Sequence, residues 1–277
     1  MSVERTVEDH YSHGTLIATI EAALAASGID PDAVTVADLA PVDEFHIGGR
    51  AATVDLAGKL ALAPSDRALD VGSGLGGASR FFADEFGCAV TGIDLTAEYV
   101  ATARTLSERV GLGERNTFEH ASALAMPFGD ASFDAAYMLH VGMNIAAKTE
   151  LFTETARVLV PGGRLGIYDV MRTGDGEIVY PVPWAETGET SFVASPEDYR
   201  AALESASLDL HEEQNRRDWA LEFFRTLRAK AAGADGPPPL GIHILMGERA
   251  GKKVANMLRC VTAGIIAPVQ IIARKPG

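Results

Sequence analysis

The stretch Ala68-Leu-Asp-Val-Gly-Ser-Gly-Leu-Gly-Gly77 decides the fold of this 277-residue chain. Its glycines fit the spacing Gly72-x-Gly74-x-x-Gly77, which is the fingerprint of a dinucleotide-binding turn. They also fit a second pattern, in which Asp70 is followed by glycines at alternate positions. Either pattern predicts a buried strand, a sharp glycine turn and a helix whose N-terminus faces a ligand.

The acid before the glycines discriminates between two cofactors. A carboxylate at this place would repel a pyrophosphate, which argues against a nicotinamide dinucleotide. It would attract a ligand that carries an ammonium group and a sulfonium, because opposite charges stabilise each other strongly in a partly desolvated cleft. The pattern therefore favours S-adenosylmethionine as the cofactor, with these predicted binding residues: Asp70, Gly72, Ser73, Gly74 and Gly76.

A second acid follows at the distance that such a fold needs. Cys88-Ala-Val-Thr-Gly-Ile-Asp94 is typical of a short buried strand with an acid at its carboxyl end. Asp94 lies 24 positions after Asp70 (94 − 70), close to the roughly 20 residues that separate a glycine loop from its ribose-binding acid. We expect the ribose hydroxyls to donate to Asp94, with Leu95 beside it.

Three further stretches add to this order of elements. They are His120–Asp134, which contains Met126-Pro-Phe and Ser132-Phe-Asp, the apolar run Ala135–His140, and Leu151–Ile167, which contains Arg157-Val-Leu-Val-Pro-Gly-Gly. With the glycine turn, they resemble the class I S-adenosylmethionine-dependent methyltransferases, above all the branch of ubiquinone/menaquinone-biosynthesis and sarcosine/dimethylglycine methyltransferases. The resemblance covers about residues 43–170. It implies direct transfer of a methyl group to a nitrogen, oxygen or carbon nucleophile of a small molecule.

The resemblance also assigns contacts to the cofactor. It implies that Tyr11 covers the sulfonium and that the segment from His46 to Gly48 lies over the methionyl end. Ser122 stands where the family usually has an acid that hydrogen-bonds the adenine amino group. A serine hydroxyl accepts such a bond without charge assistance, so adenine discrimination should be weaker. The backbone of Ala123 would bond the adenine ring.

His140 is the predicted catalytic residue. It ends the fourth strand, after Leu139, at the point where this fold faces the reacting methyl group. An imidazole titrates near neutrality and suits a general base or a group that orients the acceptor. The alternative is a half-buried histidine that bonds a backbone carbonyl. Methyl transfer from a sulfonium needs alignment and exclusion of water but no acid and no metal, so one base or none would suffice.

The acceptor pocket is predicted after the fifth strand. Tyr180-Pro-Val-Pro-Trp184 suits a pocket wall, and it suits equally a small hydrophobic cluster that anchors a long loop. Because this segment has few cationic groups, the sequence favours an uncharged acceptor over an amino acid. The candidates for contact with the acceptor are Met143, Tyr180 and Trp184, followed by Phe192, His243, Met246, Arg50 and Arg172.

Composition excludes several classes of partner. A net charge of −14 without a visible basic cluster argues against nucleic acid. Cys88 and Cys260 are too far apart in sequence to suggest a metal site or a disulfide framework, which favours the cytoplasm. The acidic N-terminus does not resemble a signal peptide. The apolar segment from Val261 to Ala273 is too short to span a bilayer, so no membrane insertion is expected. A homodimer is compatible with these observations.

The predicted fold is α/β and doubly wound, with a mostly parallel seven-stranded sheet and helices on both faces. Residues 1–49 would form an N-terminal helical cap, with a helix between His13 and Gly28 and then a loop containing Pro31 and Pro41. Residues 50–277 would form a Rossmann-like domain with a lid insertion at about 169–195.

Two other functions remain open at this stage. One is a non-catalytic protein that binds S-adenosylmethionine, which would show binding without turnover. The other is a nicotinamide-dependent oxidoreductase, which Asp70 and the absence of a Tyr-x-x-x-Lys pair disfavour.

Overall fold

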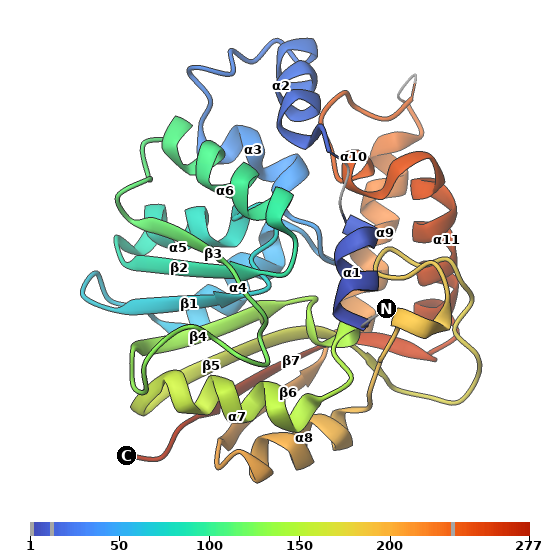
Figure 1. Ribbon diagram of the computed structural model, residues 1–277. Helices are drawn as coiled ribbons and strands as arrows, with labels where there is room; N and C mark the ends of the chain where they lie inside the picture. The colour runs from blue at the N-terminus through green and yellow to red at the C-terminus, as the bar shows by residue number, and fades with distance from the viewer. Residues whose placement is uncertain (1–2, 12–13, 234–235) are drawn as a thin grey trace.

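One seven-stranded sheet organises the protein, and it is seen in a computed structural model that describes residues 3–11, 14–233 and 236–277 (Figure 1). The strand order is β3-β2-β1-β4-β5-β7-β6. The strands are β1 Arg67–Val71, β2 Ala89–Asp94, β3 Asn116–His120, β4 Phe133–Leu139, β5 Leu159–Arg172, β6 Asp209–Asn215 and β7 Ile266–Arg274.

The sheet is mostly parallel, as predicted. Strands β1 to β5 pair in parallel, whereas β7 runs antiparallel to both β5 and β6. The chain order reverses beside β1, which pairs with β2 on one side and β4 on the other. Such a reversal opens a crevice at the carboxyl ends of the strands, where ligands bind in open α/β sheets.

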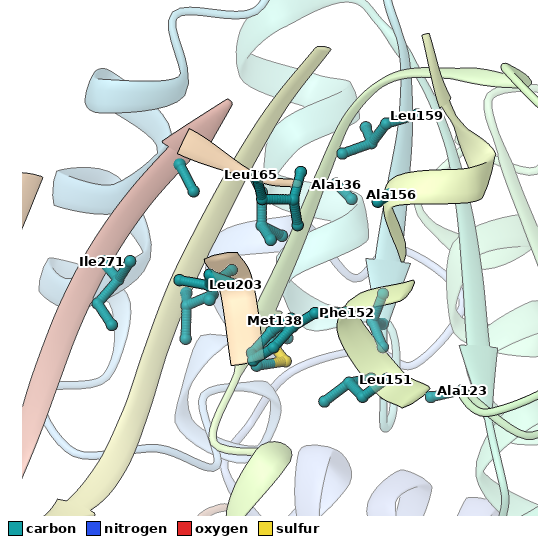
Figure 2. Close-up of a cluster of buried hydrophobic side chains, with 14 of the residues drawn as sticks. Ala123, Ala136, Met138, Leu151, Phe152, Ala156, Leu159, Leu165, Leu203 and Ile271 are labelled. Atoms are coloured by element: carbon teal, nitrogen blue, oxygen red, sulfur yellow. The ribbon is translucent and has the colours of Figure 1, made fainter. Parts of the chain in front are cut away.

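Alternate strand residues face opposite layers of helices. One layer contains α7 Lys148–Val158 and α8 Pro196–Ser205, and the other contains α4 Arg50–Leu60 and α5 Gly77–Phe86. The first cluster includes Leu69, Ala136, Met138, Leu151, Phe152 and Leu203, several of them drawn in Figure 2. The second includes Ala68, Ala135, Tyr137, Leu56, Leu60 and Phe82. Each large apolar side chain buried in this way contributes roughly 1.5–3 kcal/mol, and together the two clusters hold the strand ends in place.

Three further helices flank the sheet. Helix α6 Ala97–Arg109 follows β2, and α9 Arg217–Ala231 follows β6. Helix α11 Ala250–Thr262 precedes the last strand. The apolar segment from Val261 to Ala273 is divided between two elements, because Val261 and Thr262 complete the last turn of α11 and β7 begins at Ile266. No helix in the described ranges is long and apolar enough to cross a membrane.

The N-terminal segment contains α1 Val3–Tyr11, α2 Leu16–Ala26 and α3 Val36–Asp43. The predicted loop around Pro41 is wrong, since Pro41 lies inside α3. A capping box explains this helix: the Thr35 hydroxyl accepts from the Asp38 amide at 3.2 Å, and Asp38 accepts from the Thr35 amide at 3.0 Å. The proline removes the backbone donor that would bond the carbonyl of Ala37, and the helix ends two residues later, at Asp43.

The insertion after β5 begins later than expected. Residues 169–172 belong to β5, because β7 pairs along its whole end up to Arg172 opposite Ile266. The insertion itself contains the short 3-10 helix η2 Gly188–Thr190. A second covering segment, which the sequence analysis did not predict, contains α10 His243–Met246 and the 3-10 helix η3 Gly247–Arg249. Figure 1 shows α1 and the orange-to-red helices α9, α10 and α11 at the same side of the sheet.

Candidate functional site

The glycine turn after β1 is bound to the neighbouring strand. The amides of Gly72 and Ser73 donate to the carbonyl of Ile93 at 2.8 and 2.9 Å. Gly72 has φ +72°, and a Cβ at this position would lie 2.5 Å from the side chain of Val141. Only glycine combines this backbone conformation with so close an approach, so the turn packs directly against Val141 and Ile93.

A cavity of about 250 Å³ lies over the carboxyl ends of β1, β2 and β4, and we name it the donor pocket. The structure brings together at this pocket every predicted cofactor-binding residue except two. The predicted residues that line it are Tyr11, His46, Asp70, Gly72, Ser73, Gly74, Asp94, Leu95, Ser122, Ala123 and Leu139.

The two exceptions are glycines that serve packing. A Cβ on Gly48 would lie 2.1 Å from the ring of Trp219, and one on Gly76 would lie 2.6 Å from Phe118. Both have positive φ angles, +93° and +76°. Neither lines the donor pocket, and close packing alone accounts for glycine at both positions.

Two carboxyl groups face the donor pocket, that of the buried Asp70 and that of the half-buried Asp94. Asp70 is 2% exposed and accepts a hydrogen bond from the Ser79 hydroxyl at 2.7 Å. Burial raises the pKa of Asp70 to about 7. Asp94 accepts from the amides of Gly74 at 2.9 Å and Thr96 at 2.8 Å, and burial raises its pKa above the usual range. Because burial makes both charges costly, a cationic ligand would stabilise their ionised forms.

The N-terminal helix completes one wall of the pocket. The Ser122 hydroxyl donates to the Glu4 carboxylate at 2.5 Å and accepts from the amide of Leu124 at 3.1 Å. Tyr11 donates to the side-chain oxygen of Asn144 at 3.2 Å. Glu4 and Asn144 were not predicted as site residues, because their approach depends on how α1 packs and no local motif marks it.

His140 follows directly after β4 in a left-handed backbone conformation, φ +56°. Its amide donates to the carbonyl of Tyr168 at 2.7 Å. The two ring nitrogens are buried and have no hydrogen-bond partner among the described residues, so the ring does not bond a backbone carbonyl. Burial lowers the pKa of His140 well below its usual value. The ring is therefore a neutral imidazole whose polar atoms are free for a ligand.

A second histidine stands beside the first, with 5.9 Å between the ring centroids of His46 and His140. The Nε2 atom of His46 lies 3.1 Å from both the Gly49 carbonyl and the Thr53 hydroxyl. Burial lowers the pKa of His46 to about 4. Both imidazoles are thus neutral, and they do not oppose each other electrostatically.

The nearest carboxylate to this pair is already neutralised. Glu44 lies 3.4 Å from Nε2 of His46 and accepts from the Thr53 hydroxyl at 2.6 Å. Arg50, a candidate for binding a substrate carboxylate, instead forms an ion pair with Glu44. Arg172 donates to the carbonyl of Gly176 at 2.9 Å. Both arginines are therefore engaged within the protein.

A larger cavity of about 1020 Å³ adjoins the donor pocket, and we name it the apolar cavity. The residues that line both spaces are Tyr11, Phe45, His46 and His140. Met143 and Trp184 line the apolar cavity as predicted, and so do His243 and Met246. Tyr180 and Phe192 line neither space.

Tyr180 lies outside both spaces because of local packing. Its ring lies among the partly buried side chains of the cluster formed by the insertion, α9 and α11. The stretch of prolines and aromatics thus serves both roles considered for it, with Trp184 in the cavity wall and Tyr180 in the anchoring cluster.

No group of His, Cys, Asp and Glu side chains large enough to hold a metal ion occurs in the described part of the chain.

Comparison with known proteins identifies the central part of the chain. A model of the methyltransferase domain family matches residues 69–167. The 27-O-demethylrifamycin SV methyltransferase of Amycolatopsis mediterranei is 32% identical over 190 residues, covering 64% of this chain and 68% of that protein. A sterol 24-C-methyltransferase of Gibberella zeae is 34% identical over 118 residues, 43% of this chain and 31% of that protein. The chain therefore spans about a third of the sterol relative.

A solved structure shows the same fold. Geranyl diphosphate C-methyltransferase from Streptomyces coelicolor A3(2), in complex with Mg²⁺, geranyl diphosphate and S-adenosyl-L-homocysteine, aligns with a TM-score of 0.66 at 21% identity. The alignment covers 81% of this chain and 80% of that one.

Proposed function

The chain belongs to the S-adenosylmethionine-dependent methyltransferases, and from this premise we propose that it methylates a hydroxyl group of a small molecule, with His140 as the proton acceptor. One observation carries the proposal. His140 lines both the donor pocket and the apolar cavity, and its buried ring nitrogens have no partner among the described residues.

The residues of the donor pocket fit the cofactor. Asp70 would hold the ammonium group, since no cationic side chain of the described residues bonds its buried carboxyl, which therefore gains most from a positive ligand. Asp94 would accept from the ribose hydroxyls, and Leu95 and Ala123 would flank the adenine. When bound, S-adenosylmethionine supplies a methyl group on a positively charged sulfur, which leaves as a neutral thioether.

His140 would remove the proton of the acceptor hydroxyl. A hydroxyl is a weak nucleophile until its proton is removed, so a base within hydrogen-bond reach accelerates the transfer. The low pKa of His140 keeps the ring in its proton-accepting form at neutral pH. After the methyl transfer, the proton taken from the hydroxyl passes from the ring to solvent.

The surroundings of His140 favour a neutral oxygen nucleophile over a charged amine. His46 is neutral, and Glu44 is paired with Arg50. An ammonium group placed here would lose its hydration without gaining an unpaired carboxylate. The rifamycin relative, whose name describes an O-methylation, supports the same choice.

We also propose that residues 1–49 act as a cap and that the segment after β5 acts as a lid. Glu4, Tyr11 and His46 from the first segment line the donor pocket, and Trp184 from the second lines the apolar cavity. The free cysteines Cys88 and Cys260 are both buried, which supports a reducing location such as the cytoplasm.

Replacing His140 tests the mechanism. We expect His140→Ala to lower turnover at least about tenfold, the range of a lost general base, while the Kd for S-adenosylhomocysteine changes by no more than about threefold. Turnover is measured with a panel of phenols and alcohols, and binding by calorimetry. His211→Ala, at an exposed position of β6, is the matched control.

Two results would overturn the proposal. Unchanged turnover in His140→Ala would remove this residue from the mechanism. Binding of S-adenosylhomocysteine by the native protein without turnover of any acceptor on the panel would favour the non-catalytic alternative.

A further inference from the structure

The apolar cavity is much larger than methyl transfer to a small nucleophile requires. Its volume of about 1020 Å³ compares with about 250 Å³ for the donor pocket. Small-molecule sites have volumes of roughly 300–1,000 Å³, so this cavity lies at the upper end. An acceptor of amino-acid size would leave most of it filled with water.

We propose that the apolar cavity binds a bulky, uncharged and largely apolar acceptor, and that helix α11 sets the limit on acceptor size. This inference rests on the proposed function, since it places the acceptor hydroxyl at His140 and the rest of the molecule toward α9 and α11. The geometry points to a rigid polycyclic or macrocyclic alcohol or phenol and away from an amino acid.

The chemistry of the cavity wall supports this class of molecule. The wall comes from segments far apart in sequence, and its apolar members include Met143, Trp184, Phe224, Val254, Met257 and Leu258. Methionine and aromatic side chains give large contact areas, and methionine adapts to irregular shapes. Such a surface gains stability from burying hydrocarbon and offers little to an ionic group.

The charged residues of the cavity leave its interior electrically neutral. Glu44 and Arg50 pair with each other. Arg228 and Glu248 are exposed to solvent and therefore lie at the mouth. A carboxylate or ammonium group deep in the cavity would lose water without a partner, which costs several kcal/mol in general and disfavours charged acceptors.

Two polar side chains mark the end of the cavity that meets the donor pocket. His46 and His140 stand at the junction with the donor pocket, and the Nδ1 and Nε2 atoms of His140 have no partner in the described ranges. A molecule with one hydroxyl at the end of an apolar body therefore satisfies His140 and the apolar wall at the same time.

Helix α11 offers a position at which the cavity can be narrowed with little disturbance. Gly251 lines the cavity at its solvent-exposed mouth, its φ is not in the left-handed region, and a Cβ there would meet nothing within 4 Å. Gly58 in α4 is also helical with open space at its Cβ, but it lines neither the donor pocket nor the apolar cavity. Gly251→Trp and Gly58→Trp thus form a matched pair. Val254→Phe narrows the same wall from a half-buried position.

The experiment measures acceptor binding apart from turnover. Native protein saturated with S-adenosylhomocysteine is titrated with 1-naphthol, with β-estradiol and with N,N-dimethylglycine. We expect the two neutral alcohols to bind with Kd below about 100 µM and dimethylglycine to give no heat. Gly251→Trp and Val254→Phe should raise the Kd for β-estradiol at least about tenfold and the Kd for 1-naphthol much less. Gly58→Trp should change neither Kd.

The outcomes separate this inference from the proposed function. Binding of dimethylglycine in place of the alcohols, or β-estradiol binding that neither α11 variant alters, would overturn the inference even if S-adenosylhomocysteine binds and His140→Ala is inactive. Failure of S-adenosylhomocysteine to bind, with size-dependent binding of the alcohols retained, would instead overturn the proposed function.

Discussion

The donor pocket and the apolar cavity meet at His140 but are built in different ways. Most residues that form the donor pocket lie between 70 and 147, at the ends of successive parallel strands. Those of the apolar cavity come from distant parts of the chain, namely Tyr11 and the segments at about 40–50, 140–184 and 223–258. One space is thus specified locally by a strand-and-turn pattern, and the other by long-range packing.

The two spaces also differ in charge. The donor pocket contains the carboxyl groups of the buried Asp70 and the half-buried Asp94. In the apolar cavity, the buried carboxylate of Glu44 is paired with Arg50. This difference predicts that changes of charge or pH act on the donor and leave a neutral acceptor almost unaffected.

The largest effect is expected from Asp70→Asn. The amide retains an acceptor for the Ser79 hydroxyl but removes the charge that would hold the ammonium group. We expect the Kd for S-adenosylmethionine to rise at least about 100-fold, as for the loss of a buried charge pair, with binding of 1-naphthol unchanged. Calorimetry with each ligand measures both constants.

Stability provides a second measurement on the same variant. Burial raises the pKa of Asp70 to about 7, whereas an unfolded aspartate titrates near 3.9. The folded state therefore binds this proton more tightly than the unfolded state does. Ionisation of Asp70 lowers the free energy of unfolding as the pH rises from about 4 to about 7. Asp70→Asn should raise the melting temperature of the ligand-free protein at pH 7. Intact donor affinity in this variant would refute the assignment of Asp70.

A smaller effect is expected from pH itself. Because a cationic donor needs the ionised form of Asp70, the Kd for S-adenosylmethionine should rise up to about tenfold per unit as pH falls below about 7. The Kd for 1-naphthol should stay flat over this range, since burial keeps His46 and His140 neutral there. Titrations between about pH 5.5 and pH 8 test the contrast, and Asp70→Asn should flatten the donor profile. The same pH dependence of Kd for both ligands would contradict the difference in charge between the donor pocket and the apolar cavity.

The residues predicted to bind the cofactor come together at the donor pocket for a physical reason. Asp70, Gly72 and Gly74 lie within one turn, and a single strand pairing places Asp94 beside them. The glycines allow a sharp turn and the aspartates supply a charge, and few other residue types can do either. The sequence pattern therefore predicts where these residues lie. The seven-stranded, mostly parallel sheet followed from the same alternation of apolar runs and helices.

The apolar cavity could be predicted only in part. Trp184 and Met143 were candidates, but the wall from α9 and α11 was not predicted, because an apolar helix face looks the same in sequence whether it lines a cavity or fills a core. For Tyr180 the sequence left a pocket wall and an anchoring cluster equally open, and the ring lies in the cluster. Pro41 misled the prediction of α3 because the capping box at Thr35 outweighs one lost backbone donor.

The smallest effect tests whether the cap contributes to the donor pocket. Glu4 from α1 lines the pocket and accepts a hydrogen bond from Ser122, yet it is exposed, so water screens its charge. We expect Glu4→Gln to raise the Kd for S-adenosylmethionine by about two- to threefold and to leave the Kd for 1-naphthol unchanged. Glu21→Gln, on α2 and outside both spaces, is the matched control. If Glu4→Gln lowered the affinity for S-adenosylmethionine as much as Asp70→Asn does, the cap and not the strand ends would dominate recognition of the donor. The donor pocket would then depend on distant segments, as the apolar cavity does.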